Sequence, residues 1–169
     1  MESKERMINV YRRVYSIPRL ARTLKILGAL AVFYVAGVFV YGVGNLLWVG
    51  QYLYAAELVS VAAVPFMAVT LMRYFINAER PYEVFDIDEL KALKEKGKKG
   101  HSFPSRHVFS AFLIGVLFIP YGVAFGIAAL LLGAFIAVER VLLGIHFVRD
   151  VLVGAVIGAL SGLVGVLIL

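Results

Sequence analysis

The feature that most constrains this chain is the length of its stretches without any charged side chain. No Asp, Glu, Lys or Arg occurs over residues 26–56, a run of 31 positions, or over residues 108–138, another 31. A third run covers the last 19 residues, 151–169. A helix needs about 20 mostly apolar residues to cross the hydrocarbon core of a bilayer. The sequence therefore predicts an all-α protein built from membrane-spanning helices.

The composition agrees with a membrane protein and excludes several other classes. Of 169 residues, 62% are hydrophobic and 17% are charged, and the mean hydropathy is +0.88. A soluble domain of this size buries only about two-thirds of the surface that its unfolded chain exposes, so it could not hide this much apolar surface. We exclude a soluble globular enzyme and a disordered chain. The absence of cysteine also excludes a disulfide scaffold, thiolate catalysis and cysteine-bound metals.

The apolar runs divide into five predicted spans. The first two are separated by a short turn near Gly50. The run after His107 is too long for one span, and a Pro-Tyr-Gly sequence at residues 120–122 interrupts it. The predicted spans are residues 26–49, 52–72, 105–119, 123–141 and 149–169.

Two other segments are predicted to lie at the membrane surface. Residues 1–24 place apolar side chains at helical spacing among basic ones, a pattern typical of an amphipathic helix in the bilayer interface, and Pro18 is expected to end that helix. Residues 86–100 have acids first and lysines last, which favours a short helix. We therefore divide the chain into an interfacial arm, 1–24, and a transmembrane domain, 25–169.

All basic residues fall on one face of the predicted bundle. The 17 Lys and Arg residues occur in the first 25 residues, in the connection 73–107 or in the turn 140–150, and five spans place these segments on the same side. In so apolar a chain, a net charge of +6 indicates anionic lipid headgroups or phosphate as partners rather than nucleic acid. The positive-inside rule would make this face cytoplasmic, whereas a phosphate site would gather Arg and Lys on either side.

Three short segments on the basic face carry residues suited to chemistry. They are Arg73-x6-Arg80-Pro81 at the end of the second predicted span, Pro104-Ser105-Arg106-His107 at the start of the third, and Arg140-x5-His146-x3-Asp150 between the fourth and fifth. Each segment alone is a weak signal, because such short combinations occur by chance. Together they are informative, since three segments distant in sequence reach the same membrane depth.

The residues of these segments fit cleavage of a phosphate ester without a metal ion or cofactor. His146 and Asp150 are four residues apart, so on one helix face the carboxylate can hold one imidazole nitrogen while the other attacks phosphorus. His107 is the candidate to protonate the departing alkoxide, and Ser105 adds a neutral donor at a helix N-terminus. The arginines expected to surround the phosphoryl oxygens are Arg73, Arg80 and Arg140. No cluster of histidines or carboxylates has the spacing of metal ligands within this site.

The three segments resemble the signature motifs of the type 2 phosphatidic acid phosphatase family, integral-membrane lipid phosphatases related to vanadium haloperoxidases. The family pattern is K-x6-R-P, P-S-G-H and S-R-x5-H-x3-D, and the spacing inside each motif matches over residues 73–150. The resemblance implies that His146 is the nucleophile, Asp150 its partner and His107 the general acid. The residues that it implies in phosphate binding are Arg73, Arg80, Ser105, Arg140 and, through its backbone, Arg106. Bacterial lipid A 1-phosphatases and phosphatidylglycerophosphatase B-type enzymes are the members most similar in size and layout.

The chain departs from the family pattern at three positions. Arg73 replaces Lys and keeps the positive charge. Arg106 replaces Gly. Glu139 replaces Ser, which removes a hydroxyl donor and places an acid beside the expected phosphate site. We expect Arg106 and Glu139 to compensate each other as an ion pair.

Three functions stay open on the sequence. The first is a lipid phosphatase that acts through a phosphohistidine on lipid A 1-phosphate, phosphatidylglycerophosphate, phosphatidic acid or undecaprenyl diphosphate, all of which present phosphate at headgroup depth. The second is a lipid-to-lipid phosphotransferase, and the third a non-catalytic lipid-binding bundle. The expected location is a bacterial inner membrane, and the family resemblance favours a site on the periplasmic face, against the charge rule.

Overall fold

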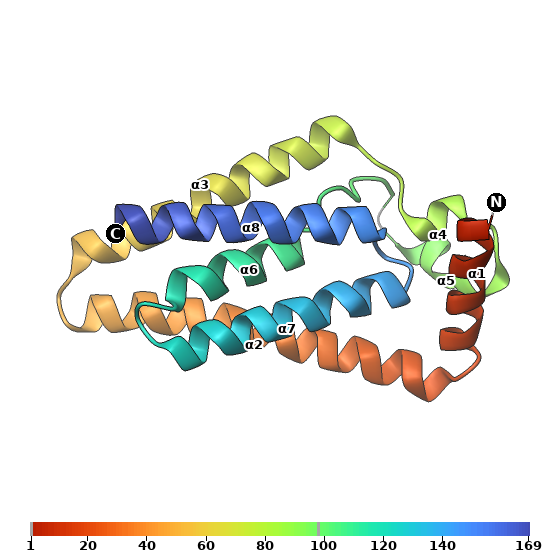
Figure 1. Ribbon diagram of the computed structural model, residues 1–169, viewed down its shortest axis with the longest axis horizontal. Coiled ribbons are helices and arrows are strands. Elements are labelled where there is room, and N and C mark those ends of the chain that lie inside the picture. The colour runs from red at the N-terminus through yellow and green to blue at the C-terminus, as the bar shows by residue number, and fades with distance from the viewer. Residues whose placement is uncertain (1, 98) are drawn as a thin grey trace.

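The computed structural model describes residues 2–97 and 99–169, and in this part of the chain all regular structure is helical (Figure 1). Met1 of the predicted arm and Lys98 of the predicted 86–100 helix lie outside the described residues. The helices are α1 (Glu2–Tyr15), α2 (Pro18–Trp48), α3 (Tyr52–Ile76), α4 (Pro81–Val84), α5 (Asp88–Lys96), α6 (Arg106–Phe118), α7 (Val123–Leu142) and α8 (Val148–Ile168). The expected all-α membrane bundle is confirmed.

Four of the described helices, α2, α3, α7 and α8, are long and apolar enough to cross a membrane. The third predicted span corresponds to α6, which has only 13 residues. At about 1.5 Å per residue such a helix extends about 20 Å, less than the roughly 30 Å of the hydrocarbon core. The described chain thus contains four candidate spans and one shorter apolar helix, in the predicted order, rather than five spans of full length.

The short helix α6 lies inside the bundle, where it packs mainly against α8 and α7 (Figure 1). Its side chains Val108, Phe109, Leu113 and Leu117 are almost completely buried and belong to the main hydrophobic core. A segment surrounded by protein does not have to match the thickness of the bilayer. This explains how an apolar helix of 13 residues is accommodated among longer ones.

Glycines on α8 allow the close approach of α8 to α6. Gly154, Gly158 and Gly162 are buried on one face of α8, the spacing that lets membrane helices pack backbone to backbone. A Cβ atom at Gly154 would lie 2.7 Å from the carbonyl oxygen of Ser105, and one at Gly158 would overlap the carbonyl oxygen of Phe109. The packing fixes the start of α6 against the start of α8.

At one end of the bundle, outside the long helices, α1 packs against α5 (Figure 1). Tyr11 of α1 is buried with Phe85 and Leu90 in a second hydrophobic cluster, and the rings of Tyr11 and Phe85 are 5.7 Å apart between centroids. The helix predicted over residues 86–100 is present as α5, which Gly97 follows directly.

The helix boundaries near the N-terminus differ from the expectation. The first helix ends at Tyr15, and Pro18 begins α2 instead of only ending the helix before it. A proline suits the first turn of a helix because its fixed φ is helical. Proline also lacks an N–H, and at this position an N–H would have no partner within the helix. Residues 18–24 of the expected arm therefore form the first turns of α2.

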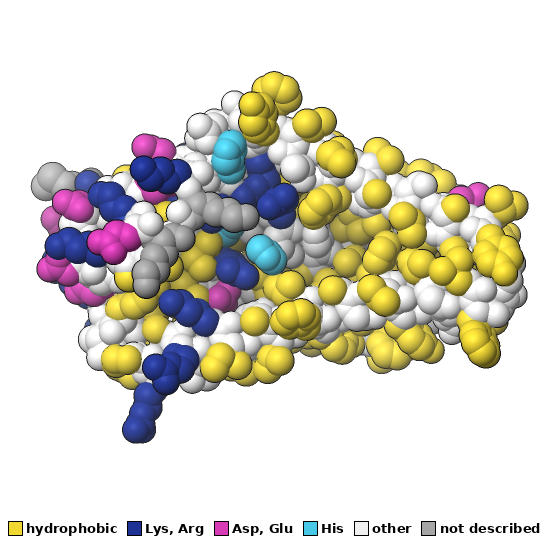
Figure 2. Space-filling model, turned by 180° about the vertical axis from the view of Figure 1, so that it is seen from behind, with side chains coloured by type: hydrophobic (Ala, Val, Ile, Leu, Met, Phe, Trp, Pro, Cys, Tyr) yellow, Lys and Arg dark blue, Asp and Glu magenta, His cyan; other side chains and the backbone are white. Residues whose placement is uncertain are grey.

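The charged side chains are concentrated at the end of the molecule that holds α1, α4 and α5. Figure 2 shows Lys, Arg, Asp and Glu gathered there, whereas the rest of the visible face is almost entirely hydrophobic. Histidine side chains lie beside a group of Lys and Arg at the border between the two regions, where this face is hollowed. This border is where the three motif segments meet.

Candidate active site

The predicted site residues come from four helices and two loops that converge at the charged end of the bundle. They are Arg73 in the last turn of α3, Arg80 after it, Ser105, Arg106 and His107 at the start of α6, Arg140 in the last turn of α7, His146 in the following turn and Asp150 in the first turn of α8. They lie close enough to interact electrostatically, because the charges of Arg140, Arg106 and Arg73 all act on His107. The structure thus brings the three segments into one site.

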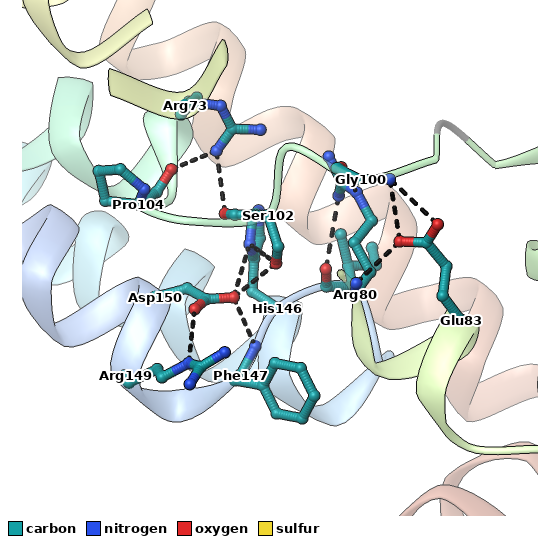
Figure 3. Close-up of polar contacts among 11 residues, drawn as sticks. Arg73, Arg80, Glu83, Gly100, Ser102, Pro104, His146, Phe147, Arg149 and Asp150 are labelled. Atoms are coloured by element: carbon teal, nitrogen blue, oxygen red, sulfur yellow. Dashed lines mark hydrogen bonds and ion pairs between the residues drawn. The ribbon is translucent and has the colours of Figure 1, made fainter. Parts of the chain in front are cut away.

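His146 and Asp150 form the buried centre of this site (Figure 3). The imidazole Nδ1 of His146 is 3.5 Å from Oδ2 of Asp150. The same carboxylate oxygen accepts hydrogen bonds from the hydroxyl of Ser102, at 2.5 Å, and from the backbone N–H of Phe147, at 3.0 Å. The exposed fractions are 3% for His146 and 0% for Asp150. Asp150 is therefore fixed by several donors, and it fixes the imidazole in turn.

Ser102 is a member of this centre that the sequence analysis did not find. Its hydroxyl oxygen is 3.2 Å from Nδ1 of His146 while it donates to Asp150, and its side chain is completely buried. No motif includes it. The nearest signal is its position three residues before Ser105, and a buried loop serine cannot be recognised from such a position.

The tautomer and charge of His146 follow from these contacts. Since Ser102 donates to Asp150, the proton of the neutral imidazole belongs on Nδ1, where it can be donated to either oxygen, and Nε2 keeps its lone pair. Burial lowers the pKa of His146 below its usual 6.5; the hydrogen bond to Asp150 opposes this, and the positive charges of Arg80 and Arg73 add to the lowering. A neutral imidazole with a free Nε2 is the form that can act as a nucleophile.

A tight turn after α7 carries His146 into the site. The backbone N–H groups of Ile145 and His146 both donate to the carbonyl of Arg140, at 3.0 and 3.2 Å. Gly144, with a φ of +69°, supplies the left-handed conformation that this turn needs. Its carbonyl accepts from the N–H of Tyr82 in α4, at 3.3 Å, which ties the turn to the end of the first motif segment, Arg73-x6-Arg80-Pro81.

Arg73 and Arg80 hold the loops of the site in place (Figure 3). Arg73 Nη1 donates to the carbonyls of Ser102, at 3.0 Å, and of Pro104. Arg80 Nε donates to the carbonyl of Gly100, at 3.0 Å, and its Nη1 to that of Ile145, at 3.4 Å. Each guanidinium has five N–H groups, so both retain donors beyond those used on the loops.

Glu83 is a second residue that the sequence analysis missed. Its carboxylate accepts from the backbone N–H of Arg80, at 2.8 Å, and from that of Gly100, at 3.0 Å to each oxygen. The first of these bonds is half of a capping box on α4. The Arg-Pro start with Glu at the third helical position is a signal that could have predicted this capping role.

Ser105 stands at the N-cap of α6, and its hydroxyl is buried without a hydrogen-bond partner among the described residues. Its backbone N–H donates to the carbonyl of Asp150, at 2.9 Å. The side chain thus keeps an unused donor next to the free N–H groups of the helix N-terminus.

Arg106 and His107 border an apolar groove of about 420 Å³ between α2, α3, α6 and α7, which we call the α6 groove. The guanidinium of Arg106 lies 5.8 Å above the ring of Phe66. Below these polar residues the groove is lined by Val32, Val35, Phe39, Phe66, Ile114 and Ile136. The α6 groove therefore joins the charged site to the hydrophobic part of the bundle.

The expected ion pair between Arg106 and Glu139 is wrong. Glu139 lies against Arg140 instead, with Oε2 3.2 Å from Nε, and its exposed fraction is 2%. Arg106 stacks on Phe66 because its position at the first turn of α6 directs it toward the α6 groove. Over residues 2–97 and 99–169, no group of three or more His, Asp or Glu residues is placed to hold a metal ion.

Comparisons with known proteins identify the family and the fold. Residues 52–169 match the family model of the PAP2 superfamily. The crystal structure of Aquifex aeolicus LpxE superimposes with a TM-score of 0.67 at 23% identity, covering 94% of this chain and 93% of that one. No curated protein matches the sequence.

A second solved structure has the same fold. It is described as the first transmembrane PAP2 type phosphatidylglycerolphosphate phosphatase, from Bacillus subtilis, and it matches with a TM-score of 0.69 at 18% identity, covering 97% of this chain and 84% of that one. At these identities, the two structures establish the shared fold, and the family model establishes membership.

Proposed function

The chain belongs to the PAP2 superfamily, and on that premise we propose that it hydrolyses a lipid phosphomonoester or diphosphate through a phosphohistidine intermediate. The observation that carries this proposal is the buried centre of His146, Ser102 and Asp150, with arginines around it. The contacts of this centre leave Nε2 of His146 unprotonated beside positive charge. A neutral nucleophile surrounded by guanidinium groups is suited to an anionic phosphate ester.

In the first step, Nε2 of His146 attacks phosphorus, and the bond from phosphorus to the ester oxygen breaks. The negative charge of the bound phosphate favours the protonated form of His107, which donates its proton to the departing alkoxide, so that the lipid alcohol leaves neutral. In the second step His107 takes a proton from a water molecule whose oxygen attacks phosphorus. The bond from phosphorus to Nε2 of His146 breaks, inorganic phosphate leaves and the neutral imidazole is restored. Asp150 stabilises the positive charge on the imidazole between the two steps.

The α6 groove supports a lipid as the leaving alcohol. It begins at His107, the proposed proton donor, and continues between apolar side chains. Its volume of about 420 Å³ falls in the range typical of small-ligand sites. A phosphate at the charged end with its hydrocarbon in this groove would place the ester oxygen on the side of His107.

The nucleophile is tested by release of phosphate from lipid phosphates in detergent. His146→Ala is expected to abolish release and the trapping of radiolabelled phosphate on the protein. The matched control is His101→Asn, since His101 is the third histidine and has a φ of +51° that Asn tolerates. Retention of full activity in His146→Ala would refute the phosphohistidine, whereas an inactive wild-type protein would favour the non-catalytic bundle.

The substrate is tested with purified protein against the four candidate lipids, lipid A 1-phosphate, phosphatidylglycerophosphate, phosphatidic acid and undecaprenyl diphosphate. The two solved structures are described as a LpxE and as a phosphatidylglycerolphosphate phosphatase, which makes the first two the leading candidates. Inorganic phosphate should be the product. Label that appears in a second lipid would support the phosphotransferase instead.

The acid role of His107 predicts a dependence on the leaving group. His107→Ala should lower the rate with an alkyl phosphate far more than with an aryl phosphate, because a good leaving group needs little protonation. The measurement is the ratio of kcat/KM for the two esters in wild-type and variant protein. An equal loss for both esters would show that His107 is not the proton donor.

A further inference from the structure

Glu139 is a buried carboxylate at a position where the family motif has a serine. The residue lies near the C-terminal end of α7, and its exposed fraction is 2%. Few other charged side chains among the described residues are buried. A buried charge is strongly unfavourable unless it has a partner. The mechanism proposed above gives this residue no role, and its presence requires a physical explanation.

The partner of Glu139 is the next residue along the chain. Its Oε2 is 3.2 Å from Nε of Arg140; the contact is an ion pair without hydrogen-bond geometry, because neither atom has a hydrogen-bond partner among the described residues. Within residues 2–97 and 99–169, the two terminal nitrogens of Arg140 make no hydrogen bond. The carboxylate therefore engages the inner nitrogen of the guanidinium and leaves the outer N–H groups free.

The helix opposite has a space for this carboxylate. Gly28 of α2 is buried, and a Cβ atom there would lie 2.8 Å from Cδ and 2.9 Å from Oε1 of Glu139. A glycine in the interior of a helix is otherwise unfavourable by about 0.5–1 kcal/mol relative to alanine. The absence of a side chain at Gly28 thus matches the position of the Glu139 carboxylate.

We propose that Glu139 is a positioning residue that holds Arg140 by its Nε, so that the outer N–H groups of Arg140 bind the phosphoryl oxygens. The inference rests on the proposed phosphatase function. Arg140 lies near His107 together with Arg106 and Arg73, in a cluster where Arg106 and Arg80 act unfavourably on Arg73, and a counter-charge favours its place among these cations. A serine could donate a hydrogen bond to phosphate, but a carboxylate has no proton to donate, so Glu139 acts through Arg140.

The proposal predicts the opposite sign from simple repulsion. If Glu139 only repelled the phosphate, its removal would strengthen the binding of an anion. If it positions Arg140, its removal weakens binding, and the effect disappears once Arg140 is absent. Inorganic vanadate is a suitable probe because its adduct resembles the phosphoryl transition state and its binding requires no turnover.

The experiment is a double-mutant cycle on the full chain in detergent, with the Kd for vanadate measured by calorimetry. Glu139→Gln should raise the Kd about tenfold, the scale of the coupling energy between charged groups in contact. In an Arg140→Ala background the same change should alter the Kd less than about twofold, because coupled residues are not additive. The control is Glu57→Gln, an exposed carboxylate in α3, which should leave the Kd unchanged.

A second test changes the size of residue 28, with no change of charge in that step, and compares two backgrounds at residue 139. Gly28→Ala should weaken vanadate binding in the wild type, where the new methyl group meets the Glu139 carboxylate. The same substitution should have no effect in a Glu139→Ser background, in which the short side chain leaves room for it. An equal effect of Gly28→Ala in both backgrounds would refute the proposed positioning.

The outcomes separate the inference from the function on which it rests. A wild-type protein that binds no vanadate and releases no phosphate would overturn both. A wild-type protein that binds vanadate, combined with a Glu139→Gln variant of equal or lower Kd, would overturn only the role of Glu139. A loss of binding in Glu139→Gln that persists in the Arg140→Ala background would also overturn it.

Discussion

At the scale of single residues, the site depends on a serine that joins the histidine to the carboxylate. Ser102 lies between Nδ1 of His146 and Oδ2 of Asp150, within hydrogen-bond distance of both. Its backbone carbonyl also accepts from Arg73. One residue therefore connects the proposed nucleophile, its carboxylate partner and one of the proposed phosphate-binding arginines.

This position predicts that Ser102→Ala will lower activity without removing the nucleophile. A hydrogen bond to a charged group contributes about 1.5–3 kcal/mol, so we expect kcat to fall by about 10- to 100-fold. The control is Ser60→Ala, since the hydroxyl of Ser60 bonds only within its own helix, to the carbonyl of Ala56. A Ser102→Ala variant with the kcat of the wild type would show that Asp150 positions His146 without help.

The environment of His146 predicts the acidic side of the pH profile. Burial lowers the pKa of His146 below 6.5, and only the deprotonated imidazole attacks, so kcat/KM should rise with pH through a midpoint below 6.5. Asp150→Asn removes an interaction that raises this pKa, and its midpoint should lie at still lower pH with a reduced maximum. A wild-type midpoint above 6.5 would contradict the proposed environment.

Some of the site could be predicted from the sequence, because the contact of His146 with Asp150 joins residues close in the chain. The contact is present, but the expected common helix face is wrong: α8 begins at Val148, and His146 lies in the turn before it. Ser102 and Glu83 were missed because their contacts depend on how the loop before α6 folds back onto α8 and α4. The partner of Glu139 was predicted wrongly, since the direction of Arg106 is set by the α6 groove and by Phe66.

At the scale of helices, the charge-free runs were enough to predict the order of the apolar elements but not their lengths. The turn at residues 120–122 was recognised from its proline and glycine. The shortness of α6 was not, because an apolar helix buried in protein and one exposed to lipid have similar sequences. The glycines of α8 indicated close helix packing, and the structure identifies α6 as the partner.

This packing predicts a large difference between two identical substitutions. Gly158→Ala should lower the free energy of unfolding by about 1–3 kcal/mol, because its Cβ would overlap the carbonyl oxygen of Phe109. Gly44→Ala in α2 meets no atom within 4 Å and should be neutral or slightly stabilising. Thermal unfolding in detergent measures both. Equal melting temperatures would argue against the close contact of α6 and α8.

At the scale of the whole molecule, the charged end and the apolar body define how the protein sits in a bilayer. The site lies at the border between them (Figure 2), which we propose is at the depth of a lipid headgroup. Two arguments disagree on which side of the membrane this end faces. The positive-inside rule favours the cytoplasm, and the family resemblance favours the periplasm. We propose the periplasmic side.

Two single-cysteine variants test this orientation, since the chain has no cysteine. Asp88 in α5, whose side chain is 85% exposed, reports on the charged end, and the exposed Gln51 between α2 and α3 reports on the opposite end. In intact spheroplasts a membrane-impermeant maleimide should label Asp88→Cys and should label Gln51→Cys only after lysis. The reverse pattern would place the site in the cytoplasm, as the charge rule predicts.

The crowding of arginines in the site has a consequence for the end of the catalytic cycle. Arg106 and Arg80 act unfavourably on Arg73, and a tightly bound anion relieves that repulsion. Inorganic phosphate, the product, carries the same oxygens as the group being transferred and competes for the same cations. Charge density that accelerates attack on phosphorus thereby slows the departure of phosphate. We expect product retention, rather than bond cleavage, to limit the steady-state rate when phosphate accumulates.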